Sequence, residues 1–170
     1  MSHEDFVKKE RADKEEYLKS DKSPLDKKQK SKFKGLTYFD IDEKFKVSAP
    51  LTKLAEGTMT DVASSRGGVY QFVDYATFDV EFDGQKATLH ALKSDEKDST
   101  LFVSFTDTAT DTGKFCRYVD AEEKDGNITL DFNLASNPFV VFNAQYVSPL
   151  CCEANKLKIA IKAGEQAWKA

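Results

Sequence analysis

The polar side chains that could do chemistry lie mostly between residues 105 and 165, where they stand among large apolar residues. An arginine, several carboxylates and several amides are the residue types that bind a polar ligand or carry out acid–base catalysis. We interpret six of them as lining a ligand pocket: Arg117, Asp131, Asn133, Asn137, Asn155 and Glu165. The candidates for a catalytic pair of carboxylates are Asp107, Asp131 and Glu165.

Arg117 is the most informative of these residues, because the pattern of its strand bears on its burial. It shares one face with Phe115 and Val119, so it points into the core if those two apolar residues do. A buried guanidinium needs a carboxylate partner, and Asp131 on the next strand is a candidate, with the other two carboxylates as alternatives. Two interpretations stay open: a buried ion pair that fixes strand register, and an arginine that anchors a ligand at a barrel mouth.

The amides between Leu130 and Glu165 also have an interpretation that involves no ligand. Asn137-Pro138 predicts a turn, since the residue before a proline is pushed out of the helical region. An irregular segment packed on a core must satisfy its own buried backbone groups. Asn137 and Asn155 could do only that, through side-chain-to-backbone hydrogen bonds.

No motif in the sequence points to a cofactor, a metal or an activated nucleophile. The chain lacks GxxxxGK[ST], GxSxG, HExxH and CxxC. Its two histidines are fewer nitrogen ligands than a zinc site usually needs. We expect Cys116 and the adjacent Cys151 and Cys152 to be buried thiols that pack as small apolar groups. We therefore predict no metal and no cofactor, and leave open whether the protein is an enzyme.

From Gly35 onward, the elements that must position these residues read as strands. In "TFDVEFDGQKATLHAL" apolar and polar residues alternate on both sides of Asp83-Gly84, which predicts a hairpin with a two-residue turn. Further hairpins are expected at Asp125-Gly126 and Ser64–Gly68. Other strands are expected at Leu36–Ile41, Phe45–Ala49, Leu101–Phe105 and Leu157–Ala163. The predicted fold class is all-β and mainly antiparallel: a meander barrel or barrel-like sandwich of roughly nine short strands, with one N-terminal α-helix.

The N-terminal part differs in composition from the remainder. Ser2 and Asp5 have the spacing of a capping box, and helix-forming residues continue to about Leu18. A stretch with seven lysines follows, "KSDKSPLDKKQKSKFK". We interpret it as a solvated arm; the alternative is an electrostatic contact to nucleic acid or to an anionic surface. The expected organisation is an N-terminal helix and lysine-rich arm over residues 1–34, followed by a single β domain over residues 35–170.

The charge and hydropathy of the chain limit the classes of partner that we expect. Residues 1–34 hold 11 Lys and Arg against 8 Asp and Glu, while the chain as a whole has a net charge of −4. The arm has no arginine and no interleaved stacking aromatics, so we expect no nucleic-acid partner. No apolar run approaches the roughly 20 residues of a membrane span, and the N-terminus has no apolar region typical of a secretory signal. We expect a cytoplasmic location and no membrane partner; the oligomeric state stays open.

Four stretches in this order, "FTDTATDTGKFCRYVD", "LDFNLASNP", "SPLCCEANKL" and "IKAGE", resemble an uncharacterised prokaryotic family, the domain of unknown function numbered 1684. The resemblance covers about Ser23 to Trp168 and is most specific over residues 105–165. Cys151 and Cys152 occupy the positions of two prolines, so any cysteine chemistry of the family would not transfer. The resemblance implies a place for a site and no reaction. The matching positions that bear on a site are Asp107, Arg117, Asp131, Asn133, Asn137, Asn155, Gly164 and Glu165.

Three functions remain in view from the sequence. The first is a module that binds a small polar or anionic ligand in a pocket at one end of the barrel. The second is a hydrolase or isomerase that uses paired carboxylates as acid and base. The third is a non-catalytic scaffold for protein interactions. We favour the binding module.

Overall fold

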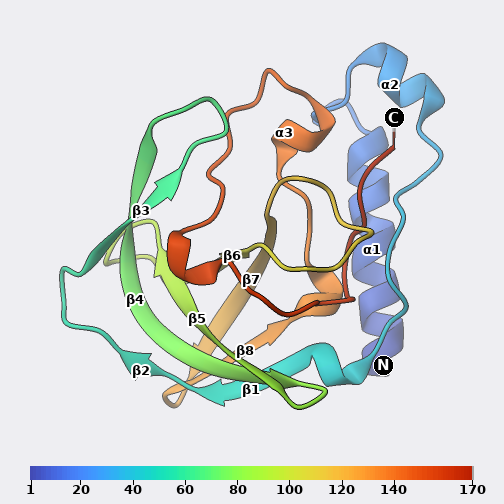
Figure 1. Ribbon diagram of the computed structural model, residues 1–170. Helices are drawn as coiled ribbons and strands as arrows, with labels where there is room; N and C mark the ends of the chain where they lie inside the picture. Colours follow the sequence, from blue (N-terminus) through green and yellow to red (C-terminus); the bar gives the residue numbers. More distant parts are fainter. Residues whose placement is uncertain (170) are drawn as a thin grey trace.

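The computed structural model describes residues 1–169, in which an antiparallel sheet of eight strands curls into a nearly closed barrel beside an N-terminal helix (Figure 1). The strands are β1 (Lys46–Pro50), β2 (Thr52–Lys53), β3 (Met59–Ala63), β4 (Val69–Phe82), β5 (Gln85–Lys93), β6 (Leu101–Phe105), β7 (Arg117–Lys124) and β8 (Asn127–Asp131). The helices are α1 (His3–Lys19), α2 (Lys27–Lys32) and α3 (Phe139–Phe142), with short 3₁₀ turns η1 (Glu43–Phe45), η2 (Phe132–Leu134) and η3 (Glu153–Asn155). The predicted fold class is confirmed.

The three predicted hairpins form the frame of the sheet. Phe82 faces Gln85 across Asp83-Gly84, and Lys124 faces Asn127 across Asp125-Gly126. All four turn residues have positive φ, with 52° at each aspartate and 79° and 76° at the glycines. This is the mirror-image turn that matches strand twist, and it explains why Asp-Gly is a reliable signal. The third hairpin joins β3 to β4 through residues 64–68.

The barrel is closed by one short segment that belongs to both edges of the sheet. The strand order is β1-β8-β7-β6-β5-β4-β2, with β3 on β4. β1 pairs with β8, and β2, which begins after Leu51, pairs with β4. Pro50 stands at the point where the chain leaves β8, facing Asn127. Proline has no N–H to donate, so it fits the end of a ladder where pairing stops.

Two of the expected strands are not strands. Leu36–Ile41 makes only an isolated bridge, Tyr38 to Glu165. Leu157–Ala163 alternates as predicted, because Leu157, Ile159, Ile161 and Ala163 are buried in the same cluster as the barrel strands. Its backbone nevertheless forms no ladder. The alternation therefore marks an extended segment that inserts side chains into the barrel, and the sequence pattern cannot tell this from a strand.

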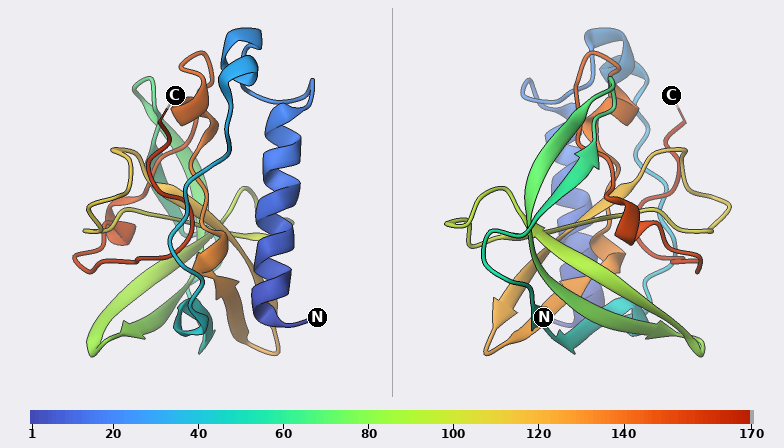
Figure 2. Two further views of the ribbon diagram at one scale, coloured as in Figure 1. Left: turned by 90° about the vertical axis from the view of Figure 1, so that its right-hand side faces the viewer. Right: turned by 60° about the vertical axis from the view of Figure 1, so that its left-hand side comes forward.

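The N-terminal helix stands alongside the barrel, as the left view of Figure 2 shows. Ser2 and Asp5 form the expected capping box, with the Asp5 N–H 3.1 Å from the Ser2 hydroxyl. Leu18 packs with Leu25 and Phe142 in a second small core that also involves Phe33, Leu36 and Trp168. The division into residues 1–34 and 35–170 stays a prediction. Within residues 1–169, no helix has both the length and the apolar character needed to cross a membrane.

Candidate functional site

Arg117 lies inside the barrel, at the end where the C-terminal segment crosses it. The side chain is 1% exposed and begins β7. One terminal nitrogen, Nη2, donates to Asp107 Oδ2 at 3.2 Å and to the Ile161 carbonyl at 2.8 Å. The other, Nη1, donates to the carbonyl oxygens of Ala163 and Glu165. The guanidinium thus joins β7 to three successive alternate residues of the C-terminal segment.

This arrangement makes Arg117 a structural clamp. Asp107 Oδ2 also accepts from the Ile161 N–H at 2.6 Å, so the ion pair and the segment form one network. Burial lowers the pKa of the Arg117 guanidinium, and the charge of Asp107 opposes that shift. The ordinary pKa of an arginine side chain is so high that Arg117 stays protonated despite this shift. Both terminal nitrogens are occupied by protein acceptors, which leaves little for a ligand.

The predicted pairing of Arg117 with Asp131 is wrong, and the reason is the length of the hairpin turn. A two-residue turn pairs Ala121 with Leu130, so odd positions of β7 face even positions of β8. Asp131 therefore points out of the barrel. There its Oδ2 lies 2.6 Å from Nε2 of His3 on α1. Asp107, one of the two alternatives, is the true partner.

Asn133 and Asn155 each replace backbone pairing where the sheet lacks it. Asn133 donates to the Asp42 carbonyl at 2.9 Å and accepts from the Asp42 N–H at 3.1 Å. Asn155 does the same with His90 of β5, and also donates to the carbonyl of Ser104 in β6, at 2.9 Å. β5 and β6 share a single paired position, so the Asn155 amide holds them together where their ladder is short. These contacts match the interpretation that involves no ligand.

Glu165 and Asn137 form a second buried network beside α1. Glu165 is 1% exposed. Its Oε2 accepts from the backbone and side-chain N–H groups of Asn137 at 2.8 and 3.0 Å, and its Oε1 pairs with Lys14 of α1. Glu165 also borders a cavity of about 410 Å³ between α1 and the outer face of β6 and β7. Tyr38 lines the same cavity, and within residues 1–169 its buried hydroxyl has no hydrogen-bond partner.

The three candidate acids do not form a catalytic pair. Asp107 binds Arg117, Asp131 binds His3, and Glu165 binds Lys14, so each has its own cationic or histidine partner. Paired carboxylates raise one another's pKa when they share a site. The contacts described here give each carboxylate its own basic partner and bring no two of the three carboxylates into contact.

The family motifs interlock with one another. Gly164 has φ of +76°, and a Cβ there would lie 2.6 Å from the Ala135 carbonyl oxygen. The next residue, Glu165, donates its N–H to that same carbonyl at 2.8 Å. "NLASNP" and "KAGE" thus meet face to face, and only glycine allows so close an approach. The motif residues chiefly position the C-terminal segment.

The cysteines are as expected: Cys116, Cys151 and Cys152 are all buried and free. Burial raises the pKa of the Cys116 thiol to about 12. No three His, Cys, Asp or Glu side chains among residues 1–169 gather closely enough to hold a metal ion.

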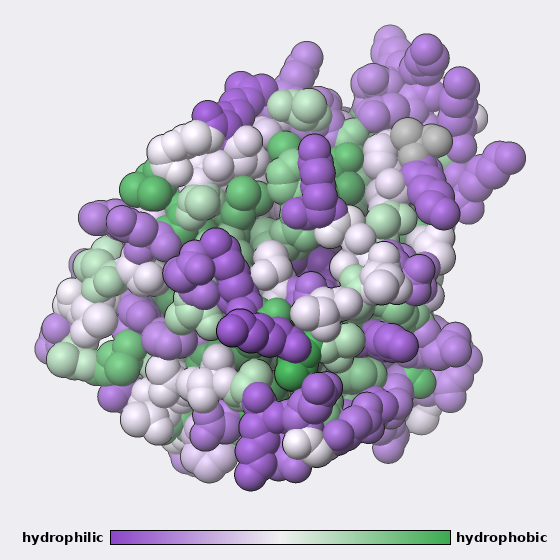
Figure 3. Space-filling model, in the orientation of Figure 1, coloured by the Kyte–Doolittle hydropathy of each residue, from purple (hydrophilic) through white to green (hydrophobic). Residues whose placement is uncertain are grey.

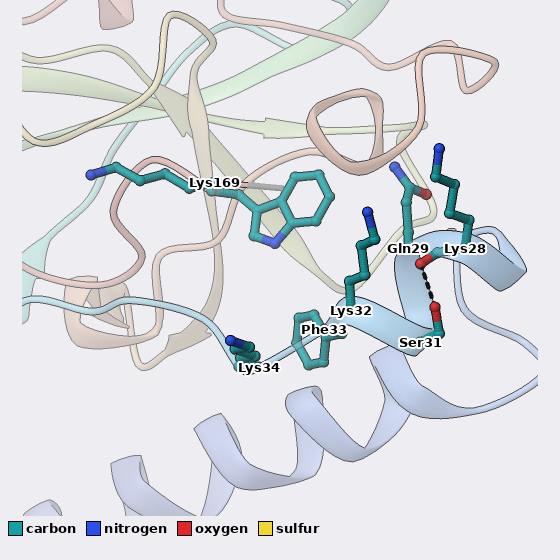
Figure 4. A pocket seen from close by; sticks show the side chains of 9 residues that line it. Lys28, Gln29, Ser31, Lys32, Phe33, Lys34 and Lys169 are labelled. Carbon is teal, nitrogen blue, oxygen red and sulfur yellow. Dashed lines mark hydrogen bonds between the residues drawn. The ribbon is translucent and has the colours of Figure 1, made fainter.

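A basic cleft, not anticipated from the sequence, lies between the lysine-rich arm and the C-terminal residues. Its volume is about 770 Å³. Hydrophilic side chains gather over α2 in this part of the surface (Figure 3). In Figure 4, Lys169 and Lys28 lie on opposite sides of the view with Lys32 between them, and the Lys169 side chain extends away from the other two. The lining residues are Lys28, Gln29, Ser31, Lys32, Phe33, Lys34, Gly35, Trp168 and Lys169. We call this feature the basic cleft.

The walls of the basic cleft are held by specific contacts. α2 begins with a capping box between Asp26 and Gln29, and Gln29 Nε2 donates to the Phe142 carbonyl at 2.8 Å. Trp168 packs edge-on against Phe142, with ring centroids 5.4 Å apart. A short helix with no buried residues is thereby fixed to the second core. Residues more than 130 positions apart in sequence form the two walls, and no periodicity predicts that they meet.

The lysines of the basic cleft differ from Arg117 in having no partner. Within residues 1–169, none of Lys28, Lys32, Lys34 and Lys169 forms an ion pair. Glu15 is the nearby acid, and it accepts the Leu36 N–H at 2.9 Å. Four lysines thus line the cleft without an ion-pair partner among residues 1–169, and the Glu15 carboxylate lies beside Gly35 at its edge.

The barrel, the N-terminal helix and the clamped C-terminal segment define a class of protein: a nearly closed antiparallel β-barrel with a helix packed on its outside. The chain belongs to the family described as protein of unknown function (DUF1684), whose model matches residues 31–166. The resemblance noted in the sequence is thus confirmed. The chain is also similar to an uncharacterized protein of Haloarcula marismortui with a solution NMR structure, at 31% identity and a TM-score of 0.71, covering 96% of this chain and 93% of that one. Comparison with curated proteins gives no match.

Proposed function

We propose that the protein binds a small anionic ligand in the basic cleft. The observation that carries the proposal is the group of four lysines around a cleft of about 770 Å³, none of which pairs with a carboxylate within residues 1–169. Lysines without an ion-pair partner attract an anion that enters the cleft. The ligand class is the one favoured from the sequence, but the location differs from the predicted barrel-end pocket.

The size and chemistry of the cleft fit a small molecule. Clefts that take small ligands usually measure about 300–1,000 Å³ and combine apolar walls with a few polar groups. Here Phe33 and Trp168 supply the apolar walls. Lysine amines act as compact point charges with rotatable donors, so they suit phosphate, sulfate or carboxylate groups without fixing one geometry.

The geometry gives less support to the other two functions. Acid–base catalysis by paired carboxylates has less support, since the carboxylates of Asp107, Asp131 and Glu165 each pair with a different basic side chain. A protein-interaction scaffold would draw on exposed apolar side chains, and Tyr17, Phe139 and Tyr146 form one aromatic row. Nothing about these three exposed aromatic residues indicates what kind of partner would bind them.

The sequence offers a direct test, because Trp168 is the single tryptophan of the chain and lines the cleft. Tripolyphosphate is the probe, titrated into the protein at low salt while tryptophan emission is followed. We expect a saturable change in emission and weaker binding as salt rises. The double variant Lys32→Gln/Lys169→Gln should weaken binding about tenfold.

The matched control is Lys22→Gln/Lys27→Gln. These two lysines are exposed and belong to the same arm, but they do not line the cleft. The two double variants lose the same charge, so a simple effect of net charge would weaken binding equally in both. Equal weakening, or no saturable change in the parent protein, would contradict the proposal.

A further inference from the structure

We infer that the ligand of the basic cleft combines an anionic group with a planar aromatic ring, as a nucleoside polyphosphate does. This inference rests on the proposed function and names its ligand class. The lysines alone would account for an anion. The two aromatic residues among them, Phe33 and Trp168, account for the ring.

Both aromatic side chains are placed so that part of each ring remains available. Phe33 ends α2 as its C-cap residue, and Trp168 lies two residues before the end of the chain. Each packs against the core of Leu18, Leu25 and Phe142 and is still partly exposed, while also lining the cleft. The edge-on contact between Trp168 and Phe142 anchors the indole ring in place.

Anchored aromatic rings beside cations are the combination that holds nucleotides. A base can stack on an aromatic ring while lysines contact its phosphates, and stacking tolerates any base because every base has a π face. The Trp168 indole N–H has no hydrogen-bond partner among residues 1–169, and a single donor of this kind can contact a ligand without distinguishing one base from another. One cleft thus offers ring surface, positive charge and a spare donor.

The cleft offers little with which to read a particular base. Gln29 uses both ends of its amide, accepting from the Asp26 N–H at 2.9 Å and donating to the Phe142 carbonyl. Ser31 donates its hydroxyl to the Lys28 carbonyl at 2.8 Å. Discrimination between bases requires free groups that match the base edge. We therefore expect adenine and guanine nucleotides to bind alike.

The charge distribution favours a free nucleotide over a nucleic-acid strand. A strand needs a basic groove that follows its backbone over several phosphates. Here Asp21 and Asp26 are exposed in the same arm, close to the lysines in sequence. Residues 35–170 carry 14 Lys and Arg against 21 Asp and Glu, so the positive charge does not continue onto the barrel.

Isothermal titration calorimetry of the full chain separates these possibilities. The probes are ATP, GTP, tripolyphosphate and adenosine, with a single-stranded oligothymidylate as the polymer. Tripolyphosphate has nearly the charge of ATP and lacks the ring. We expect ATP and GTP to bind within about threefold of each other and about tenfold more tightly than tripolyphosphate. Adenosine alone should bind weakly.

Trp168→Leu keeps an apolar side chain on the second core and removes the ring. It should remove most of the preference for ATP over tripolyphosphate, since only Phe33 remains to contact the ring, while leaving tripolyphosphate binding unchanged. Phe139→Leu is the control, because Phe139 is an exposed aromatic residue that does not line the cleft. That variant should keep the preference for ATP.

Each other outcome has a distinct meaning. Equal affinity for ATP and tripolyphosphate in the parent protein would overturn the aromatic component and leave the anion site standing. No binding of either probe would overturn both. Binding of the oligothymidylate more tightly than ATP at the same phosphate concentration would overturn the free nucleotide as the ligand.

Discussion

The protein holds cationic side chains in two different surroundings: Arg117 inside the barrel and the four lysines of the basic cleft at the surface. Arg117 is 1% exposed, and four protein oxygens accept from its two terminal nitrogens. Lys28, Lys32, Lys34 and Lys169 are exposed and have no ion-pair partner within residues 1–169. A saturated cation holds the fold together, whereas an unsaturated group of cations is free to recognise something else. In this protein the stretch that most resembles the family contains Arg117, the cation whose hydrogen-bond donors are occupied by protein oxygens.

The difference follows from the cost of burying charge. A buried guanidinium without partners would be strongly unfavourable, so the fold must supply acceptors. Exposed lysines keep their hydration and need none. Substitutions in the two regions should therefore differ in which property they change: stability in the barrel, binding in the cleft.

The largest effect is expected from Arg117→Met. The change strands the Asp107 carboxylate and three carbonyl oxygens inside the protein, which should lower the free energy of unfolding by about 3–5 kcal/mol. Arg66→Met is the control: Arg66 is exposed and also donates to two carbonyls, those of Ala144 and Gln145. It should cost less than about 1 kcal/mol. Urea denaturation measures both, and equal losses would remove the distinction between the clamp and the surface.

Gly164→Ala tests whether the motifs interlock as tightly as the structure indicates. The new methyl group would meet the Ala135 carbonyl oxygen at 2.6 Å, and φ is +76°. Left-handed backbone and overpacking together should cost about 2–4 kcal/mol. Gly68→Ala has nearly the same φ, +75°, and nothing within 4 Å of the new Cβ, so it should cost only about 1 kcal/mol. The gap between the two variants in urea denaturation isolates the close approach; no gap would contradict it.

Which parts of this fold can be predicted from sequence depends on how local their causes are. The Asp-Gly hairpins are fixed by turn residues and neighbouring alternation, and they form as predicted. Leu157–Ala163 alternates for a different reason, because its side chains fill a barrel built by other segments. The burial of Arg117 follows from its strand pattern, but its partner depends on the register that the two-residue turn sets between β7 and β8.

The basic cleft cannot be predicted from the sequence, because its walls are far apart in the chain. Its two walls come from Lys28–Gly35 and from Trp168–Lys169, which meet only because Leu18, Leu25, Phe142 and Trp168 form a second core. The seven lysines of the arm were visible as a solvated stretch. The sole tryptophan, Trp168, is the one sequence signal for a site here, and the sequence does not show that it lies close to the arm.

The cleft should respond to an anion where the barrel does not. Tripolyphosphate at about ten times its dissociation constant should raise the free energy of unfolding of the parent protein by ~1.4 kcal/mol, because it binds only the folded chain. Lys32→Gln/Lys169→Gln should lose most of that gain while its stability without the probe changes by less than about 0.5 kcal/mol. Thermal unfolding with and without the probe measures both. A large loss of stability in the variant alone would show that these lysines belong to the architecture.

The smallest expected change in stability comes from Asp120 on the outer face of β7. Its side chain lies on the face of the strand opposite to that of Arg117. Asp120 is exposed at the edge of the cavity beside α1, and desolvation there, and then repulsion from Asp98, raises its pKa. The folded state therefore disfavours the ionised form, so this carboxylate destabilises the fold at a pH above both its folded and unfolded pKa values and has no such effect below them. Asp120→Asn should raise the free energy of unfolding by up to about 0.5 kcal/mol at neutral pH, a figure discounted for solvent screening. The gain should vanish near about pH 3, where the carboxyl is protonated in both states.

Glu122→Gln is the control for Asp120→Asn, since Glu122 is exposed on the same strand and the same face. Urea denaturation of both variants and the parent at the two pH values gives the comparison. A gain in Glu122→Gln equal to that in Asp120→Asn would attribute the effect to the net charge of the acidic barrel. A gain confined to Asp120→Asn would show that β7 carries one charge with protein partners, that of Arg117, and one charge that lowers stability, that of Asp120. That second kind of charge is the barrel's nearest counterpart to the lysines of the cleft.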